Sequence, residues 1–192
     1  MRRMLLLIIS LFISISFAST IGGYGELHWD LEGEEMDFHR FVIFYGHTWD
    51  DAWSFKAEVE IEHNMVKGGT YDGELELEQA YVNWFNGSWG WKGGVVLAPV
   101  GIINVTHEPP TFLSVERPKY HNEIIPTTWF GNGFSFFGNA SDFWWEVTLM
   151  EDLKGQSMLD CMCIRNGRGK GDISTTTSLT KIVTISWTGL DG

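Results

Sequence analysis

Two neighbouring stretches decide the fold, SFKAEVEIEH (residues 54–63) and GELELEQAYVNWF (residues 73–85). Acidic and apolar residues alternate in both, which is the pattern of a β-strand with two unlike faces, because successive side chains of a strand point to opposite sides. A soluble sheet turns its apolar face to a protein core, whereas a membrane barrel turns that face outward to lipid. The alternation therefore predicts two strands and leaves open what each face contacts.

Strand-like patterns also occur elsewhere in the chain. A change of phase between Leu77 and Ala80 indicates a bulge in the second quoted stretch. The predicted strands cover residues 23–31, 37–49, 53–63, 74–85, 89–98 and 178–187. No helical periodicity is evident, so we expect an all-β chain.

The connections between the predicted strands differ in length in a regular way. Residues 50–52 and 86–88 form tight turns, whereas residues 63–73 and 99–131 form longer loops. Short turns at one end and long loops at the other are typical of an antiparallel up-and-down transmembrane barrel, although a simple meander can show the same alternation.

The tight turns are flanked by the aromatic residues Trp49, Trp53, Phe85, Trp89 and Trp91. Such residues suit an interfacial girdle in a barrel, or a core or sugar-stacking surface in a soluble protein.

The N-terminal sequence MRRMLLLIISLFISISFAS predicts a signal peptide over residues 1–19, because two basic residues precede a short apolar run and small residues follow it. No later run is long and apolar enough for a spanning helix.

The chain has 13 basic and 25 acidic residues, and without Arg2 and Arg3 its net charge changes from −12 to −14. A nucleic-acid partner is therefore not expected.

Three runs resemble the porin-like outer-membrane proteins of Gram-negative bacteria, the broad group that includes phosphate-selective porins. They are HRFVIFYGHTWDDAWSFKAEVEIEH, GELELEQAYVNWF and GGVVLAPVGIINVTHEPPTFLSVERPKYHNEIIPTTW. The resemblance covers residues 22–138 and implies a barrel in the outer membrane, surrounded by its lipids and often assembled as a homotrimer. It also implies passive diffusion of small hydrophilic solutes or ions. The likeness fades after Phe143, so residues 20–192 are expected to form an incomplete barrel.

If the apolar faces contact lipid, the charged side chains of the strands line the pore. The predicted pore-lining residues are Arg40, Lys56, Glu58, Glu60, Glu62, Glu74, Glu76, Glu78 and Lys92. A hairpin centred near Gly68 would place Glu58 opposite Glu78, Glu60 opposite Glu76 and Glu62 opposite Glu74. Like charges that face each other require screening by water or cations, which a lumen or the wet face of a soluble sheet supplies. Arg40 is expected to reach Glu60 or Glu62.

The resemblance further implies that the long loop folds inward as a constriction. Its candidate residues are His107, Glu108, Glu116, Arg117 and Lys119, and an exposed surface loop is the alternative. Because the predicted lumen is acidic, phosphate selectivity is not carried over and a preference for cations is expected.

Motifs of enzymes and of cofactor sites are not found. There is no nucleophile elbow, HExxH motif or phosphate-binding glycine loop. His107 and His121 are too far apart in sequence for a recognisable metal site, and the two-residue spacing of Cys161 and Cys163 on an extended segment disfavours a disulfide. We therefore expect no enzyme, cofactor or metal. The alternative to a porin is a secreted jelly-roll protein that binds or cleaves carbohydrate, since an acidic, tryptophan-rich all-β chain suits that class.

Overall fold

A computed structural model describes residues 19–68, 72–112, 126–187 and 189. Residues 1–18 of the predicted signal peptide lie outside this part of the chain, and Ser19 is the first residue of a strand. Three of the predicted constriction-loop residues, Glu116, Arg117 and Lys119, also lie outside it.

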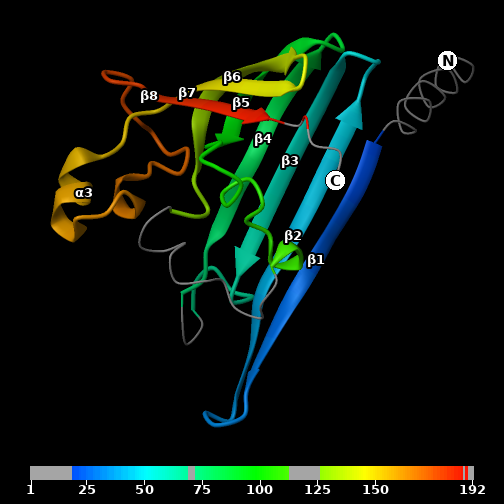
Figure 1. The fold of residues 1–192 in the computed structure, drawn as a ribbon. Helices are drawn as coiled ribbons and strands as arrows, with labels where there is room; N and C mark the ends of the chain where they lie inside the picture. The colour runs from blue at the N-terminus through cyan, green and yellow to red at the C-terminus, as the bar shows by residue number, and fades with distance from the viewer. Residues whose placement is uncertain (1–18, 69–71, 113–125, 188, 190–192) are drawn as a thin grey trace, which may run out of the picture.

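The described residues form one eight-stranded antiparallel sheet in which every strand pairs with its neighbours in sequence (Figure 1). The strands are β1 (Ser19–Asp30), β2 (Glu35–Thr48), β3 (Trp53–Glu62), β4 (Leu75–Phe85), β5 (Trp89–Leu97), β6 (Phe130–Ala140), β7 (Phe143–Met150) and β8 (Thr180–Trp187). The predicted all-β class and up-and-down strand order are confirmed. Between the described residues of β1 and β8 no pairing closes the sheet. Sequential strand order also differs from the Greek-key order of a jelly roll.

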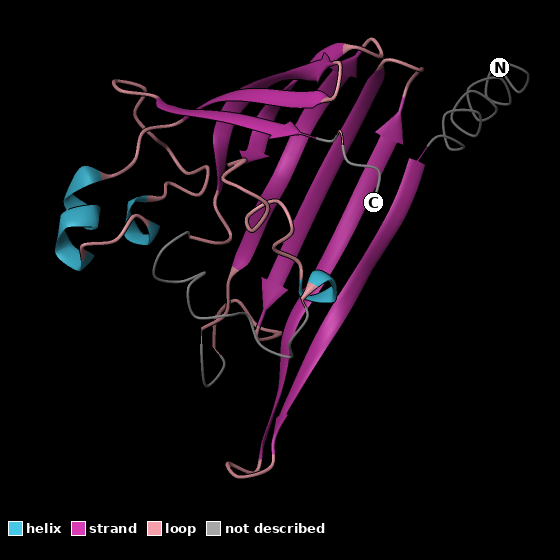
Figure 2. Cartoon of the chain, viewed as in Figure 1, coloured by secondary structure: helices cyan, strands magenta, loops and turns pink. Residues whose placement is uncertain are grey.

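Helical structure in the described residues is limited to short pieces in the connections (Figure 2). These are η2 (Pro109–Thr111), α3 (Gly155–Cys161) and η3 (Arg165–Gly167). None of the helices in the described ranges is long and apolar enough to cross a membrane.

The cysteine prediction is wrong, because Cys163 is disulfide-bonded. The prediction assumed an extended segment. Instead, α3 ends at Cys161 and Met162 adopts a left-handed conformation with φ 55°, so the chain turns sharply before Cys163.

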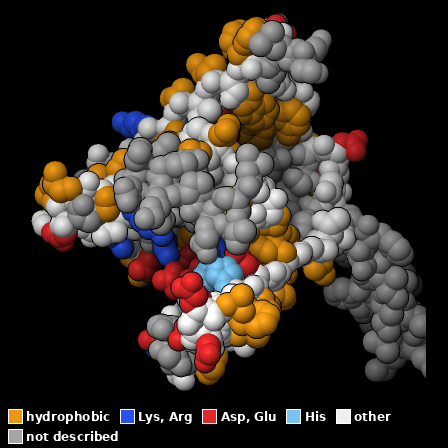
Figure 3. Space-filling view, turned by 60° about the horizontal axis from the view of Figure 1, so that its bottom comes forward, with side chains coloured by type: hydrophobic (Ala, Val, Ile, Leu, Met, Phe, Trp, Pro, Cys, Tyr) orange, Lys and Arg blue, Asp and Glu red, His pale blue; other side chains and the backbone are white. Residues whose placement is uncertain are grey.

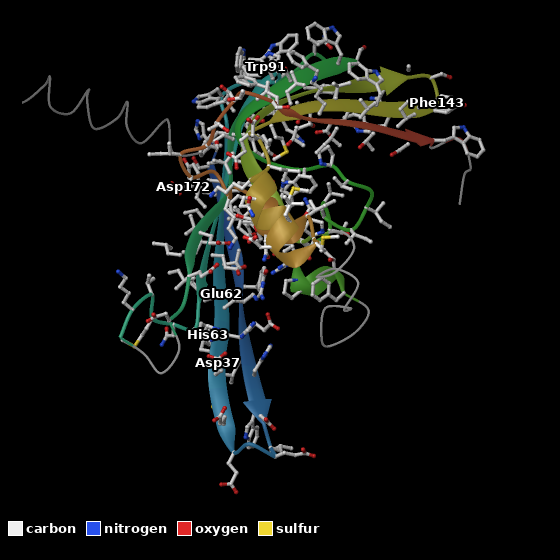
Figure 4. All side chains as sticks on the ribbon, turned by 90° about the vertical axis from the view of Figure 1, so that its left-hand side faces the viewer. Asp37, Glu62, His63, Trp91, Phe143 and Asp172 are labelled. Carbon is white, nitrogen blue, oxygen red and sulfur yellow. The ribbon has the colours of Figure 1, made fainter. Side chains whose placement is uncertain are left out.

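The sheet bends, so that β6 to β8 project across from β1 to β4, and helix α3 and the described residues directly after β5 lie within the bend (Figures 1 and 4). We call the side within the bend the inner face; it carries Arg40, Glu58 and Glu60. The outer face is the opposite side, with Phe41, Ile43 and Leu75. Glu58 and Glu60 are buried, whereas the three apolar side chains are exposed.

Short turns join β2 to β3, β4 to β5 and β6 to β7, at the end of the sheet where Trp91 and Phe143 lie (Figure 4). Trp53 pairs with Trp84, Trp84 with Trp91 and Trp91 with Phe136. This register places a row of aromatic side chains across four strands. The longer connections, residues 63–74, 98–129 and 151–179, begin and end at the opposite end of the strands.

A small apolar core anchors the segment after β5 to the inner face. Val96, Ala98, Trp129 and Met150 form this core. Buried Asn104 fastens the segment, because its Nδ2 donates to the carbonyls of Ala98 (2.8 Å) and Trp129 (2.7 Å), and its Oδ1 accepts from the Trp129 N–H (2.8 Å). This clamp holds the segment that carries His107 against the sheet.

Candidate functional site: the charged inner face

Arg40 is the centre of an ion-pair cluster on β1, β2 and β3. Its Nε lies 2.9 Å from Glu26, and its Nη atoms lie 3.3 Å from Glu60 and 3.8 Å from Glu62. The predicted reach of Arg40 to Glu60 and Glu62 is confirmed, whereas sequence reasoning missed Glu26. The cross-strand pairing of Glu26 with Arg40 follows only once β1 and β2 are aligned, so no local signal identified it.

His107 is the centre of a second cluster, in which the segment after β5 contacts the inner face of the sheet. Its Nε2 lies 3.1 Å from Glu78, 3.4 Å from Glu108 and 3.6 Å from Glu58. Its Nδ1 donates to the carbonyl of Asn104 at 2.9 Å. Both ring nitrogens therefore face acceptors, which favours the doubly protonated, positively charged ring.

The surroundings of His107 and Glu108 shift their proton affinities. Burial alone lowers the pKa of His107, but hydrogen bonds to Glu58 and Glu78 and the charges of Glu78 and Glu108 raise that pKa to about 10. Burial and contact with Glu58 raise the pKa of Glu108 to about 7, although a hydrogen bond from Tyr24 opposes this shift. The cluster therefore holds a cationic imidazole among carboxyl groups at neutral pH.

The predicted pairing of the glutamates is confirmed in part. Glu60 pairs with Glu76, and the Glu62 N–H donates to the Glu74 carbonyl at 2.9 Å. Glu58 pairs with Gln79 instead of Glu78. The reason is the bulge, which was predicted in this region: Glu78 is the extra residue, and both Glu78 and Gln79 are buried.

A cavity of about 210 Å³ lies between an acidic and a basic wall. The acidic side comes from β3 and β4, and the basic side from Arg165, Arg168 and Lys170 in the connection after β7. Lys170 forms ion pairs with Glu74 at 2.8 Å and with Glu76. Arg165 and Arg168 donate to the carbonyls of Thr127 and Thr128. Sequence analysis missed these three cations because their segment does not alternate.

Lys92 and Lys56, the two remaining predicted pore-lining residues, lie apart from the Arg40 and His107 clusters. Lys92 pairs with Glu146 of β7 at 2.9 Å. Lys56 lies over the Phe44 ring, 5.9 Å from its centroid. Sequence analysis missed Glu146. Glu146 and Thr148, which are both buried, alternate with Val147 and Leu149. This alternation could have identified β7.

Two groups of side chains in the described ranges could hold a metal ion, although none was expected. One contains Glu58, Glu78, His107 and Glu108, and the other contains Asp37, His39 and His63. In the first group, the protonated ring of His107 already supplies the positive charge that a metal ion would otherwise bring to the glutamates. Figure 3 shows histidine side chains among acidic ones at the loop end of the inner face.

Comparison with known proteins finds a relative in Aquifex aeolicus (strain VF5), described as an uncharacterized protein. It is 38% identical over 143 residues, which are 71% of this chain and 33% of the relative. The chain thus spans about one third of the length of this relative. No family model and no solved structure matches the chain.

Proposed function

We propose that this chain forms part of the wall of a porin-like channel in the outer membrane of a Gram-negative bacterium. Small hydrophilic solutes or ions would diffuse along its inner face, and lipid would cover its outer face. The observation that carries the proposal is the inverted burial of β3 and β4, where Glu58 and Glu60 are buried and Leu75 and Leu77 are exposed.

Apolar side chains continue across the outer face from one edge of the sheet to the other. The exposed ones include Leu27, Ile43, Leu75, Phe134, Phe136, Val183 and Ile185. Exposed apolar patches on soluble monomers rarely exceed a few hundred Å². A face that crosses eight strands is better suited to lipid, and the row of Trp53, Trp84 and Trp91 at its short-turn end suits the membrane interface.

The inner face suits the passage of ions. Three basic residues face the glutamates of β3 and β4 across the cavity, and opposed charges set up a transverse field that orients permeating solutes. His107 and Glu108 bring the segment after β5 onto the same face, which favours the constriction role expected for this loop. Closure into a pore requires hydrogen-bonding partners for the edge strands β1 and β8, supplied by further strands or by further copies of the chain.

Cell fractionation tests the location. The chain expressed in a Gram-negative host should be recovered in the outer-membrane fraction, and detergent should be required to extract it. Recovery as a soluble periplasmic protein would contradict the proposal.

Bilayer recordings test the chemistry of the channel. The acidic inner face should concentrate cations at low salt, where the Debye length is about 10 Å at 0.1 M. Changing both Glu60 and Glu76 to Gln should shift the reversal potential towards lower cation preference, whereas Glu35→Gln at the exposed start of β2 should not. Anion preference in the parent channel would overturn the selectivity proposed here.

A further inference from the structure

A bulge in β2 turns Asp37 and His39 to the inner face. Glu26 pairs with Arg40 and His28 pairs with Asp37, so Phe38 and His39 together lie opposite Leu27. The extra residue shifts the strand's alternation by one position, and such bulges commonly re-aim side chains. As a result, Asp37 and His39 lie on the same side as Arg40, although simple alternation would place them on the outer face.

His63, directly after the neighbouring strand β3, lies beside Asp37 and His39. It follows the last residue of β3, its backbone is left-handed with φ 52°, and its N–H donates to the His39 carbonyl at 3.0 Å. Its Nδ1 lies 2.9 Å from Asp37 Oδ2, and the His39 Nδ1 lies 3.0 Å from the same oxygen. Figure 4 shows Asp37 and His63 side by side below Glu62, towards the loop end.

The three side chains have the separation that a small transition metal requires. Their ligand atoms all lie within 4.8 Å of one another. Metal–ligand bonds of about 2.0–2.1 Å in a tetrahedral site place the ligands roughly 3.3 Å apart. The two Nδ1–Oδ2 distances are a few tenths of an ångström shorter, so a small outward movement of the rings would admit an ion in place of the two hydrogen bonds.

The surroundings favour a cation that enters from solvent. The side chains of Asp37, His39 and His63 are 39%, 26% and 29% exposed, so an ion can reach them and a water molecule can complete its coordination. The His28 ring stacks on His39 with 4.2 Å between centroids and fixes its orientation. His28 is itself held by Glu26 at 2.6 Å.

We propose that Asp37, His39 and His63 form a binding site for a divalent transition-metal cation of the Zn²⁺ class at the loop end of the inner face. Two imidazoles and one carboxylate are ligands that Zn²⁺, Co²⁺ and Ni²⁺ accept, whereas Ca²⁺ and Mg²⁺ prefer oxygen ligands alone. The site does not depend on the proposed channel, since a chain that forms no pore can still bind the metal.

The test is a Zn²⁺ titration of the full chain in detergent after metal removal, read by competition with a chromophoric chelator. His39→Gln and His63→Gln should each weaken binding by about tenfold or more, because even the loss of an outer-shell partner costs about 10–100-fold. His47→Gln is the matched control, since His47 lies at the opposite end of β2 and contacts Ser19 at 2.7 Å. It should leave Zn²⁺ binding unchanged.

A second variant separates the two candidate clusters. His107→Gln should leave the affinity for Zn²⁺ unchanged. Loss of binding in this variant, with binding retained in His39→Gln and His63→Gln, would place the metal at Glu58 and Glu78 and would overturn the proposal.

Cobalt spectroscopy of the unsubstituted chain keeps the test independent of how the variants fold. Co²⁺ bound by two imidazoles and one carboxylate should give intense visible absorption of tetrahedral type, and Zn²⁺ should abolish it while a tenfold excess of Mg²⁺ should not. The absence of this band, or no Zn²⁺ binding by the unsubstituted chain, would also overturn the proposal.

Discussion

The inner and outer faces of β2, β3 and β4 differ in the opposite sense from the faces of a soluble sheet. On the inner face Glu58 and Glu60 are buried, whereas on the outer face Ile43 and Leu75 are exposed. Two central cations each contact several of the acids. Arg40 contacts Glu26, Glu60 and Glu62, and His107 contacts Glu58, Glu78 and Glu108. The comparison teaches that charge pairing organises the inner face, while the outer face presents exposed apolar side chains.

The largest expected effect comes from removing the central cation of the inner face. Arg40→Ala leaves three carboxylates close together without their counter-charge, and breaking a buried ion pair from one side typically costs about 3–5 kcal/mol. We expect a loss of that size in the free energy of unfolding, measured by urea titration in detergent with tryptophan fluorescence.

Lys56→Ala is the control for this change, because Lys56 lies over the Phe44 ring. Its loss should cost much less. Equal losses in the two variants would show that the Arg40 cluster does not organise the inner face.

A smaller effect is expected from placing a charge on the outer face. Val59→Lys should destabilise the protein in lipid bilayers by about 2–4 kcal/mol, the range for a basic residue on the lipid face near the bilayer midplane. Gln79→Lys is the matched inner-face variant, since Gln79 pairs with Glu58 at a similar depth and the new ammonium group would face that carboxylate. If Gln79→Lys were the more damaging change in bilayers, the assignment of the two faces would be reversed.

The smallest effect should be a pH dependence that arises where the loop contacts the inner face. The pKa of His107 in the folded chain, about 10, lies above the ordinary value of about 6.5. A raised folded-state pKa gives stability that is complete below the unfolded pKa and is lost as the pH rises to the folded one. We therefore expect stability to fall between about pH 6.5 and pH 10.

Glu108 acts in the same direction at lower pH. Its folded pKa of about 7 lies above the ordinary value, so its contribution is lost as the pH rises towards 7. His107→Gln should flatten the alkaline part of the profile, measured by thermal unfolding at several pH values. An unchanged alkaline slope in this variant would show that His107 does not carry the effect.

Alternation in the sequence predicted six of the eight strands in the described residues, all except β6 and β7. Residues 53–63 and 74–85 were expected, and the structure has Trp53–Glu62 and Leu75–Phe85. β6 was missed because it reads FGNGFSFFGNA, in which six small polar or glycine positions interrupt the apolar pattern.

The candidate site was predictable only where strand alternation places its residues. The inward direction of the glutamates follows from the pleat once lipid is assigned to the other face. Arg165, Arg168 and Lys170 belong to an irregular segment whose position depends on tertiary contacts with Thr127, Thr128 and Glu76. Asp37 and His39 could not be placed on the inner face because alternation does not reveal the bulge opposite Leu27.

The central claim is that the acidic face is wet and the apolar face contacts lipid, and site-directed labelling tests it most directly. Single cysteines would replace Glu60 and Glu76 on the inner face and Val59 and Leu75 on the outer face, in a background in which Cys161 and Cys163 are changed to Ser. In lipid bilayers, a small charged thiol reagent should modify the cysteines at 60 and 76, and a lipid-soluble quencher should reach a fluorophore attached at 59 or 75. Rapid modification by the charged reagent at 59 and 75, with protection at 60 and 76, would contradict the account.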